Sequence, residues 1–163
     1  MLGPRAAATG FRAGHFATIG STMDEAMAQA RSGERGPLWI VADEQTKGRG
    51  RLGRTWFSRP GNLYATLLLT EPCPLQNAPQ LGFVAGLALH DALAKAVPEP
   101  ASVRLKWPND VLIGGAKISG ILLEGAHRPA GKDGAEHAVA IGIGVNIAHH
   151  PDEVLYPATS LVE

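Results

Sequence analysis

The sequence predicts a single α+β domain, and three observations lead to that prediction. The chain has 163 residues, which corresponds to about one domain. Apolar residues make up 45% of it, the usual share in a globular protein with one core. Segments with strand character are unevenly separated by two helical segments, which excludes a regular βαβ repeat.

The first half of the chain contains one predicted helix, over residues 22–31. Ser21 precedes it, and serine is a favoured N-cap because its hydroxyl accepts a hydrogen bond from a free backbone N–H of the first turn. Gly33 and the Gly36-Pro37 pair end the helix, since neither residue type continues one well. The predicted strands of this half are residues 11–19, 38–42 and 63–70.

The longest predicted helix covers residues 78–97, and we expect it to be the main helix over the sheet. Its apolar residues recur at helical spacing, at Leu81, Val84, Ala85, Ala88, Leu89, Ala92, Leu93 and Ala96. Four strands follow at residues 103–106, 110–113, 117–124 and 137–147, with a hairpin turn at Gly114-Gly115 and a flexible loop at residues 131–134. Residues 148–163 are polar and lack a closing element. We therefore expect a domain truncated at its C-terminus, or one that needs a partner to cover the sheet.

Charge and cysteine content exclude several classes of protein. The 15 basic residues balance the 15 acidic ones, and a chain without net charge is a poor non-specific binder of duplex DNA. No apolar run approaches the roughly 18 residues of a membrane helix. Cys73 is the only cysteine, so no internal disulfide forms, which fits a reducing compartment. We therefore expect a cytoplasmic protein without membrane contact.

The most informative stretch is the loop at residues 46–58, which is rich in glycine and arginine. Five cations stand between Lys47 and Arg59 in a chain without net charge, which indicates an anionic ligand. Glycine lets the backbone approach a ligand, and Trp56 suits a planar group such as a nucleobase. We expect ligand binding to order this loop. Its Gly-x-Gly-x-x-Gly spacing also fits a dinucleotide site, but residues 55–61 do not predict the helix that such a site requires.

Three shorter motifs are each weak on their own. The run Lys-Trp-Pro-Asn-Asp at residues 106–110 is typical of a strand end followed by a turn. Lys117 begins an apolar strand, where a lysine usually guards the sheet edge or is solvated. Gly142 and Gly144 lie within the last strand, and glycine there favours close approach by a ligand or by backbone.

Together and in this order, the motifs GRGRLGRTWFS, GNLYATLLL, KWPND, KISGILLE and IGIGVNI resemble the catalytic domain of biotin protein ligases, or biotin–[acetyl-CoA-carboxylase] ligases. The resemblance extends from about Thr18 to Asn146. It implies a mixed β-sheet backed by helices, like that of class II aminoacyl-tRNA synthetases and lipoate ligases. It also implies a two-step reaction. Biotin and ATP form biotinyl-5′-AMP, and the adenylate then transfers biotin to a lysine of a biotin carboxyl carrier domain.

The resemblance also assigns candidate site residues. Those for catalysis are Lys117, Arg51, Arg54 and Asp110; those for biotin are Ser21, Thr22, Gln45, the backbone of Arg49, Gly120 and Gly142; those for the nucleotide are Trp56, Asn109 and Asn146. The residue types suit the chemistry, because a carboxylate must approach a phosphate and fixed cations reduce their repulsion. Lys117 would lie nearest both anions, and Asp110 would orient and deprotonate the acceptor lysine.

Further expectations follow from the same resemblance. Mg²⁺ is expected with ATP, held mainly by phosphates and water, and the sequence shows no dedicated metal cage. The pair His149-His150 is expected to be solvated. Family members usually continue into further helices and a small C-terminal β-barrel, and apolar surface left bare without them would favour a homodimer. No N-terminal winged helix fits ahead of the similar region, so we expect no DNA binding.

Three alternatives remain open on the sequence alone. A lipoate or octanoate ligase of similar fold is the nearest, and titration with biotin and with lipoate distinguishes it. A truncated module would bind biotin or its adenylate without completing transfer, and would release no pyrophosphate. A nucleic-acid-binding domain would explain the basic loop and Trp56, but it requires salt-dependent affinity, and the zero net charge argues against it.

Overall fold

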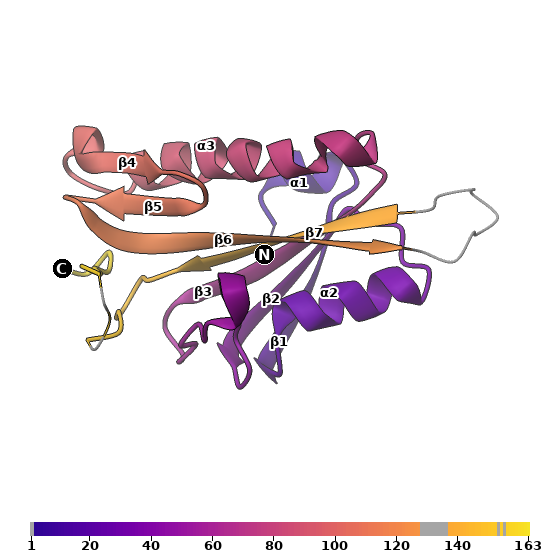
Figure 1. Cartoon of the computed structure of the whole chain (residues 1–163), viewed down its shortest axis with the longest axis horizontal. Helices are drawn as coiled ribbons and strands as arrows, with labels where there is room; N and C mark the ends of the chain where they lie inside the picture. Colours follow the sequence, from indigo (N-terminus) through magenta and orange to yellow (C-terminus); the bar gives the residue numbers. More distant parts are fainter. Residues whose placement is uncertain (1, 128–136, 153, 155) are drawn as a thin grey trace.

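The computed structural model describes residues 2–127, 137–152, 154 and 156–163. Within them the chain forms one sheet of seven strands in the order β1-β2-β3-β7-β6-β5-β4 (Figure 1). β1 and β2 are parallel, and each other neighbouring pair is antiparallel. The strands are β1 Arg12–Ile19, β2 Leu38–Gln45, β3 Leu63–Thr70, β4 Val103–Lys106, β5 Asp110–Ile113, β6 Ala116–His127 and β7 His137–Val145. The predicted α+β class with a mixed sheet is confirmed.

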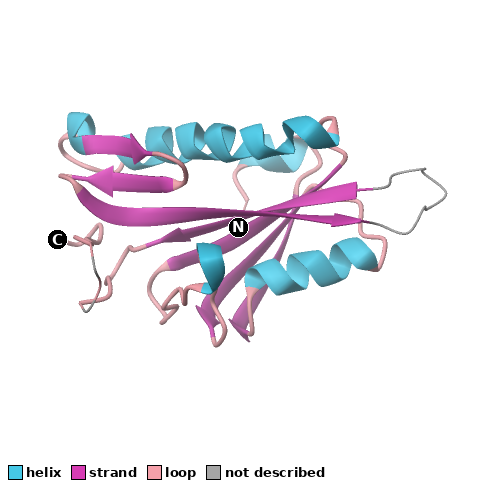
Figure 2. Cartoon of the chain, viewed as in Figure 1, coloured by secondary structure: helices cyan, strands magenta, loops and turns pink. Residues whose placement is uncertain are grey.

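Two helices cover the two faces of this sheet (Figure 2). α2 (Thr22–Arg31) packs on one face and α3 (Leu81–Ala94) on the other. The remaining helical segments are short: α1 Pro4–Ala8, η1 Arg51–Gly53, η2 Leu75–Gln80 and η3 Pro100–Ser102. The sequence did not predict α1, because this five-residue helix buries no side chain and therefore leaves no periodic apolar pattern.

Strand β7 shows how the two faces differ. Ala138 and Ala140 belong to the core beneath α2, whereas Val139 and Ile141 belong to the core beneath α3. Because side chains alternate along a strand, the α2 face of β7 carries only small residues, namely Ala138, Ala140, Gly142 and Gly144. Beyond the N-terminus of α2, Gly142 and Gly144 therefore contribute no side chains to this face of β7, which lets other groups approach the strand.

Most element boundaries agree with the sequence prediction. Ser21 caps α2, because its Oγ accepts the backbone N–H of Asp24 at 3.3 Å. The bounds of α2, β3, β4 and β5 are those expected. β2 continues to Gln45 because its pairing with β1 continues that far. The predicted flexible loop at residues 131–134 lies outside the described residues.

The prediction for α3 was partly wrong. Its first turn is the separate 3₁₀ segment η2, which contains Pro79, and the α-helix begins only at Leu81 and ends at Ala94. The sheet-facing residues are Leu81, Ala85, Leu89 and Leu93, whereas Val84 is exposed, as are Phe83 and Leu87. The helix is apolar on almost every side, so periodicity alone could not determine which face packs on the sheet.

The C-terminal segment is anchored to the sheet near residues 157–159, although the sequence predicts no closing element there. The backbone N–H of Lys117 donates to Pro157 O at 2.8 Å, and that of Thr159 donates to Lys117 O at 3.0 Å. The side-chain amide of Asn146 donates to Thr159 O at 3.1 Å. The segment therefore adds a short stretch of backbone pairing at the start of β6. No helix in the described ranges is long and apolar enough to span a bilayer.

Candidate active site

The arginine- and glycine-rich loop folds back on itself after β2. The backbone N–H of Trp56 donates to Gly48 O at 2.9 Å, and that of Gly50 donates to Arg54 O at 2.7 Å. A Cβ on Gly48 would lie 2.4 Å from Trp56 O, so only glycine fits there. The only helical turn in the loop is the 3₁₀ segment η1. No α-helix begins at these glycines, as a dinucleotide-binding loop requires, which agrees with the rejection of that interpretation from the sequence.

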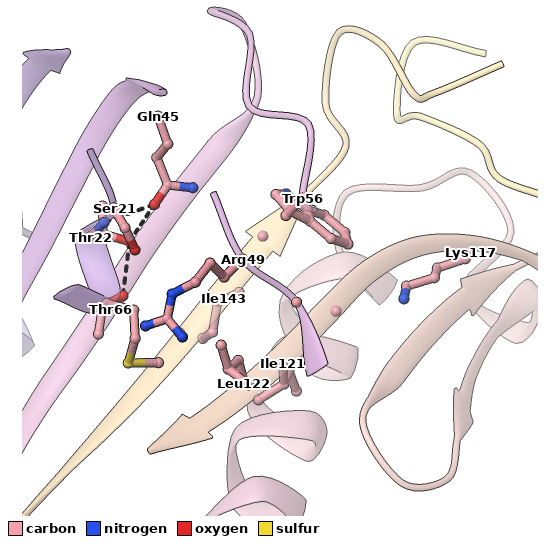
Figure 3. A pocket seen from close by; sticks show the side chains of 15 residues that line it. Ser21, Thr22, Gln45, Arg49, Trp56, Thr66, Lys117, Ile121, Leu122 and Ile143 are labelled. Atoms are coloured by element: carbon pink, nitrogen blue, oxygen red, sulfur yellow. Dashed lines mark hydrogen bonds between the residues drawn. The ribbon is translucent and has the colours of Figure 1, made fainter. Parts of the chain in front are cut away.

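A small cavity of about 60 Å³ lies under this loop (Figure 3). Its wall is the start of α2, and its floor consists of β3, β6 and β7 at Thr66, Leu122 and Gly142, which are paired across the sheet. Its roof is the loop. The residues that line it are Ser21, Thr22, Met23, Gln45, Arg49, Gly50, Trp56, Thr66, Lys117, Gly120, Ile121, Leu122, Gly142, Ile143 and Gly144.

A chain of hydrogen bonds runs along one side of the cavity and fixes the direction of each donor. The buried Thr66 hydroxyl donates to Thr22 Oγ1 at 2.9 Å, and Thr22 Oγ1 donates to Gln45 Oε1 at 3.0 Å (Figure 3). Gln45 Nε2 then donates to Ser58 Oγ at 2.9 Å, and Ser58 donates to Trp56 O. The predicted residues Thr22 and Gln45 are thus joined to Thr66 and Ser58, which the sequence reasoning missed.

The indole of Trp56 lies directly on the strand glycines. A Cβ on Gly144 would be 2.5 Å from the Trp56 ring, and one on Gly120 would be 3.2 Å from it. The nearest neighbour of a Cβ on Gly142 would instead be the methyl group of Met23, at 2.9 Å. Trp56 Nε1 is buried and has no hydrogen-bond partner within the described residues. The glycines therefore leave space for Trp56 and Met23 on the cavity floor.

Lys117 is held between an acid and two aromatic rings. Its Nζ lies 2.8 Å from Asp110 Oδ1, and the two side chains are only 15% and 20% exposed. The same Nζ lies 5.4 Å from the ring centre of Trp56 and 5.1 Å from that of Tyr156, which are cation–π distances. Tyr156 was missed because its segment contains no strand or helix pattern that would have drawn attention to it.

Trp56 and Lys117 also line a second cavity, of about 40 Å³, which lies against the C-terminal segment. Its other lining residues are Thr55, Phe57, Asn146, Pro151, Val154, Tyr156 and Ala158. Lys117 therefore lies where a ligand in one cavity would meet a ligand in the other. A partly buried cation flanked by aromatic rings suits that position for two anionic groups.

The other predicted residues differ in how closely they approach the two cavities. Arg51 Nη1 donates to Asn109 Oδ1 at 2.8 Å, and Asn109 Nδ2 donates to Ile121 O at 2.8 Å, which ties the loop to the turn beside Asp110. Arg54 is exposed and lines neither cavity. Most of the predicted residues thus line one of the two cavities, whereas Arg51, Arg54, Asn109 and Asp110 line neither. Asp110 contacts the lining residue Lys117, and Asn109 contacts the lining residue Ile121.

Contrary to the expectation that they are solvated, His149 and His150 are both partly buried. His150 Nε2 lies 2.9 Å from Glu163 Oε1, and this carboxylate raises the pKa of His150. His149 is half-buried, and its Nε2 has no partner within the part of the chain that is described. The described residues contain no group of three or more acidic, histidine or cysteine side chains that could hold a metal ion.

Comparison with known proteins identifies the family. The family model described as "Biotin/lipoate A/B protein ligase family" matches residues 16–146. A biotin–[acetyl-CoA-carboxylase] ligase of Paracoccus denitrificans is 47% identical over 137 residues, which cover 84% of this chain and 55% of that protein. The corresponding ligase of Mycobacterium tuberculosis is 39% identical over 152 residues, covering 90% and 53%. The chain spans about half the length of these relatives.

Solved structures agree with the sequence comparison. The biotin protein ligase of Leishmania major in complex with biotinyl-5-AMP has a TM-score of 0.74 at 32% identity, covering 93% of this chain and 63% of that one. The biotin protein ligase of Aquifex aeolicus in complex with biotin and ATP has a TM-score of 0.72 at 36% identity, covering 92% and 59%. The chain belongs to the biotin/lipoate A/B protein ligase family, and within it resembles the biotin protein ligases.

Proposed function

We propose that this chain is the catalytic part of an ATP-dependent biotin protein ligase. The observation that carries the proposal is the position of Lys117, which lines both cavities beneath the loop. One cavity would hold biotin and the other the adenine side of ATP. The relatives and structures compared are biotin ligases, which disfavours the lipoate or octanoate alternative.

The hydrogen-bonding groups of the first cavity suit the ureido ring of biotin. A urea has one acceptor oxygen and two N–H donors, so its site needs both donors and acceptors. Ser21 uses its oxygen as a cap acceptor and keeps its hydroxyl proton, and Gln45 Nε2 keeps one of its two hydrogens. Thr22 Oγ1 keeps an acceptor lone pair. The apolar side chains of Met23 and Leu122 would cover the rest of the bicyclic ring.

Adenylation would take place beside Lys117. A carboxylate oxygen of biotin attacks the α-phosphorus of ATP, the bond between that phosphorus and the bridging oxygen breaks, and pyrophosphate leaves. Lys117 and Arg51 would reduce the repulsion between carboxylate and phosphate, and Trp56 would stack on adenine. Asn109 would help to position phosphate, and Asn146 would contact the nucleotide. Arg51 and Asn109 line neither cavity but are joined to the lining residue Ile121 by hydrogen bonds, whereas Arg54 is exposed and its role stays a prediction.

Transfer would use Asp110. The amine of an acceptor lysine attacks the carbonyl carbon of the adenylate, the amide forms, and AMP leaves with the electron pair. The attacking nitrogen must lose a proton, and the Asp110 carboxylate beside Lys117 would accept it. The acceptor would be a biotin carboxyl carrier domain, by analogy with ligases that act on acetyl-CoA carboxylase.

Mg²⁺ would accompany ATP in this proposal. The described residues hold no acidic cluster for a resident ion, so the metal would be held mainly by phosphate oxygens and water, and Asn109 would help to place it. It would neutralise charge on the phosphates. The lone Cys73 and the use of ATP fit a reducing compartment, and we place the protein in the cytoplasm on that basis. The exposed Phe83, Val84 and Leu87 of α3 support self-association into a homodimer.

The test is incubation with biotin and Mg-ATP, followed by mass spectrometry for biotinyl-AMP, with and without a carrier domain. We expect the adenylate in both samples and a biotinylated lysine in the second. Adenylate without transfer would indicate a module that only activates biotin. Calorimetric titration showing tighter binding of lipoate than of biotin would contradict the proposal.

A further inference from the structure

The side chain of Arg49 crosses the roof of the biotin-side cavity and joins three elements. Nη1 donates to Glu124 Oε1 of β6 at 2.8 Å, and Nη2 donates to Glu124 Oε2 at 3.3 Å. Nη2 also donates to Asp24 Oδ1, in the first turn of α2, at 2.5 Å. The guanidinium therefore connects the loop to two carboxylates that the chain holds apart.

The two carboxylates lie on different sides of the cavity. Asp24 follows Ser21 by three residues, at the wall formed by α2, and Glu124 lies two residues beyond Leu122 on the floor strand β6. In Figure 3 the Arg49 side chain runs from the loop across the space between Thr22 and Leu122. Two carboxylates that share one cation would repel each other without it.

A single exposed ion pair contributes little to stability, because water screens the charges and both side chains lose conformational freedom. Here one planar guanidinium binds Glu124 in a bidentate way and reaches Asp24 with the same nitrogen, a network that lysine cannot reproduce. Within the loop the flanking backbone is also tied down, by the bonds of Gly50 to Arg54 and of Trp56 to Gly48. Lifting the roof requires both carboxylate contacts to break.

We infer that the Arg49 side chain is a positioning residue that fastens the loop over bound biotin, with Asp24 and Glu124 as its two anchors. The inference rests on the proposed function for the identity of the ligand. Arg49 would not take part in bond formation. It would hold its own backbone and that of Gly50 against the ligand, so it controls how long biotin stays bound more than how fast it enters.

The experiment compares Arg49→Gln, Asp24→Asn and Glu124→Gln with a matched control, Glu25→Gln. Glu25 lies beside Asp24 in the first turn of α2, and Glu25→Gln removes one negative charge, as Asp24→Asn does. The Glu25 carboxylate, however, accepts a hydrogen bond from Gln29 Nε2 at 2.8 Å within the helix. Biotin dissociation is measured by stopped-flow chase. Hydrogen exchange over residues 47–58 is measured on the protein without biotin.

Arg49→Gln is expected to release biotin about tenfold faster, which corresponds to about 1.4 kcal/mol, and to raise exchange over residues 47–58. Each carboxylate variant should show part of this effect, and Arg49→Lys should restore part of it. Combining Arg49→Gln with Glu124→Gln should add little, because both remove the same contact. Glu25→Gln should match the parent, which excludes a general effect of charge on the helix.

Unchanged exchange over residues 47–58 in Arg49→Gln would overturn the inference. Faster exchange with an unchanged biotin dissociation rate would also overturn it, because the side chain would then order the loop without holding the ligand. Absence of biotin binding by the parent would contradict the proposed function instead. In that case the exchange measurement still decides whether Arg49 fastens the loop.

Discussion

Replacing Gly144 with alanine tests whether the sheet is shaped to receive Trp56. The added Cβ would lie 2.5 Å from both Cε2 and Nε1 of Trp56 and 2.8 Å from Cζ2. Carbon atoms pack best at about 3.5–4.0 Å, so the indole would have to move by roughly 1 Å. Because the indole is a rigid ring, the whole side chain would have to shift to relieve these contacts. Overpacking of this kind costs about 1–3 kcal/mol.

The matched control is Gly125→Ala on the neighbouring strand β6. A Cβ there would meet only Ala138 O, at 3.9 Å, which is ordinary contact. Glycine in a strand is less favourable than alanine by roughly 0.5–1 kcal/mol, so the control should be neutral or slightly stabilised. Gly144→Ala should be destabilised, and it should bind ATP more weakly than the parent because Trp56 is displaced from the second cavity.

Urea unfolding followed by circular dichroism measures the first effect, and the KM for ATP in adenylate formation measures the second. If Gly144→Ala is as stable as Gly125→Ala and keeps the parental KM for ATP, the contact between Trp56 and the strand does not shape the site.

Three further predictions concern single side chains around the site. Trp56→Ala should raise the KM for ATP by about tenfold to a hundredfold, since stacking of a base on an aromatic ring is worth about 1–3 kcal/mol. An unchanged KM would contradict the proposed placement of adenine in the second cavity. Asp110→Asn should slow transfer to a carrier domain far more than the distant Glu99→Gln, as measured by single-turnover transfer from purified biotinyl-AMP; equal rates would argue against a base at Asp110. The His150–Glu163 pair should stabilise the C-terminal segment only between two pH limits. Their hydrogen bond lowers the pKa of Glu163 and raises the pKa of His150. The contribution is therefore lost as the pH falls below about 4.5 and Glu163 protonates, and it is lost again as the pH rises through the elevated pKa of His150. An NMR titration in which Glu163→Gln leaves the His150 pKa unchanged would contradict this.

Local signals in the sequence predicted most of the fold. Ser21 identified the start of α2 because a capping serine acts within one turn, and the bounds of β3, β4 and β5 were predicted from short segments with strand character. The face on which α3 packs was not predictable in the same way. The helix is apolar on nearly every side, so only the shape of the sheet determines that Leu89 packs inward while Leu87 does not.

For the site, motif order predicted which residues gather, but not their partners. Gly142 and Gly144 indicated a close approach, and the structure identifies Met23 and Trp56 as the neighbours. Contacts between distant segments left no local pattern. Arg49 meets Glu124 from 75 positions away, and Tyr156 reaches Lys117 from a segment of irregular structure. Such pairings depend on strand order and on the path of the loop, which a single sequence does not reveal.

In the proposed function, Lys117 brings a carboxylate and a phosphate together. The most direct test is the rate of pyrophosphate release, with biotin and Mg-ATP present, in Lys117→Ala and in Lys95→Ala. Lys95 is an exposed lysine at the C-terminal end of α3, so its loss removes the same charge away from both cavities. We predict a loss of about 10²-fold or more for Lys117→Ala and the parental rate for Lys95→Ala; equal rates in the two variants would rule out this role of Lys117.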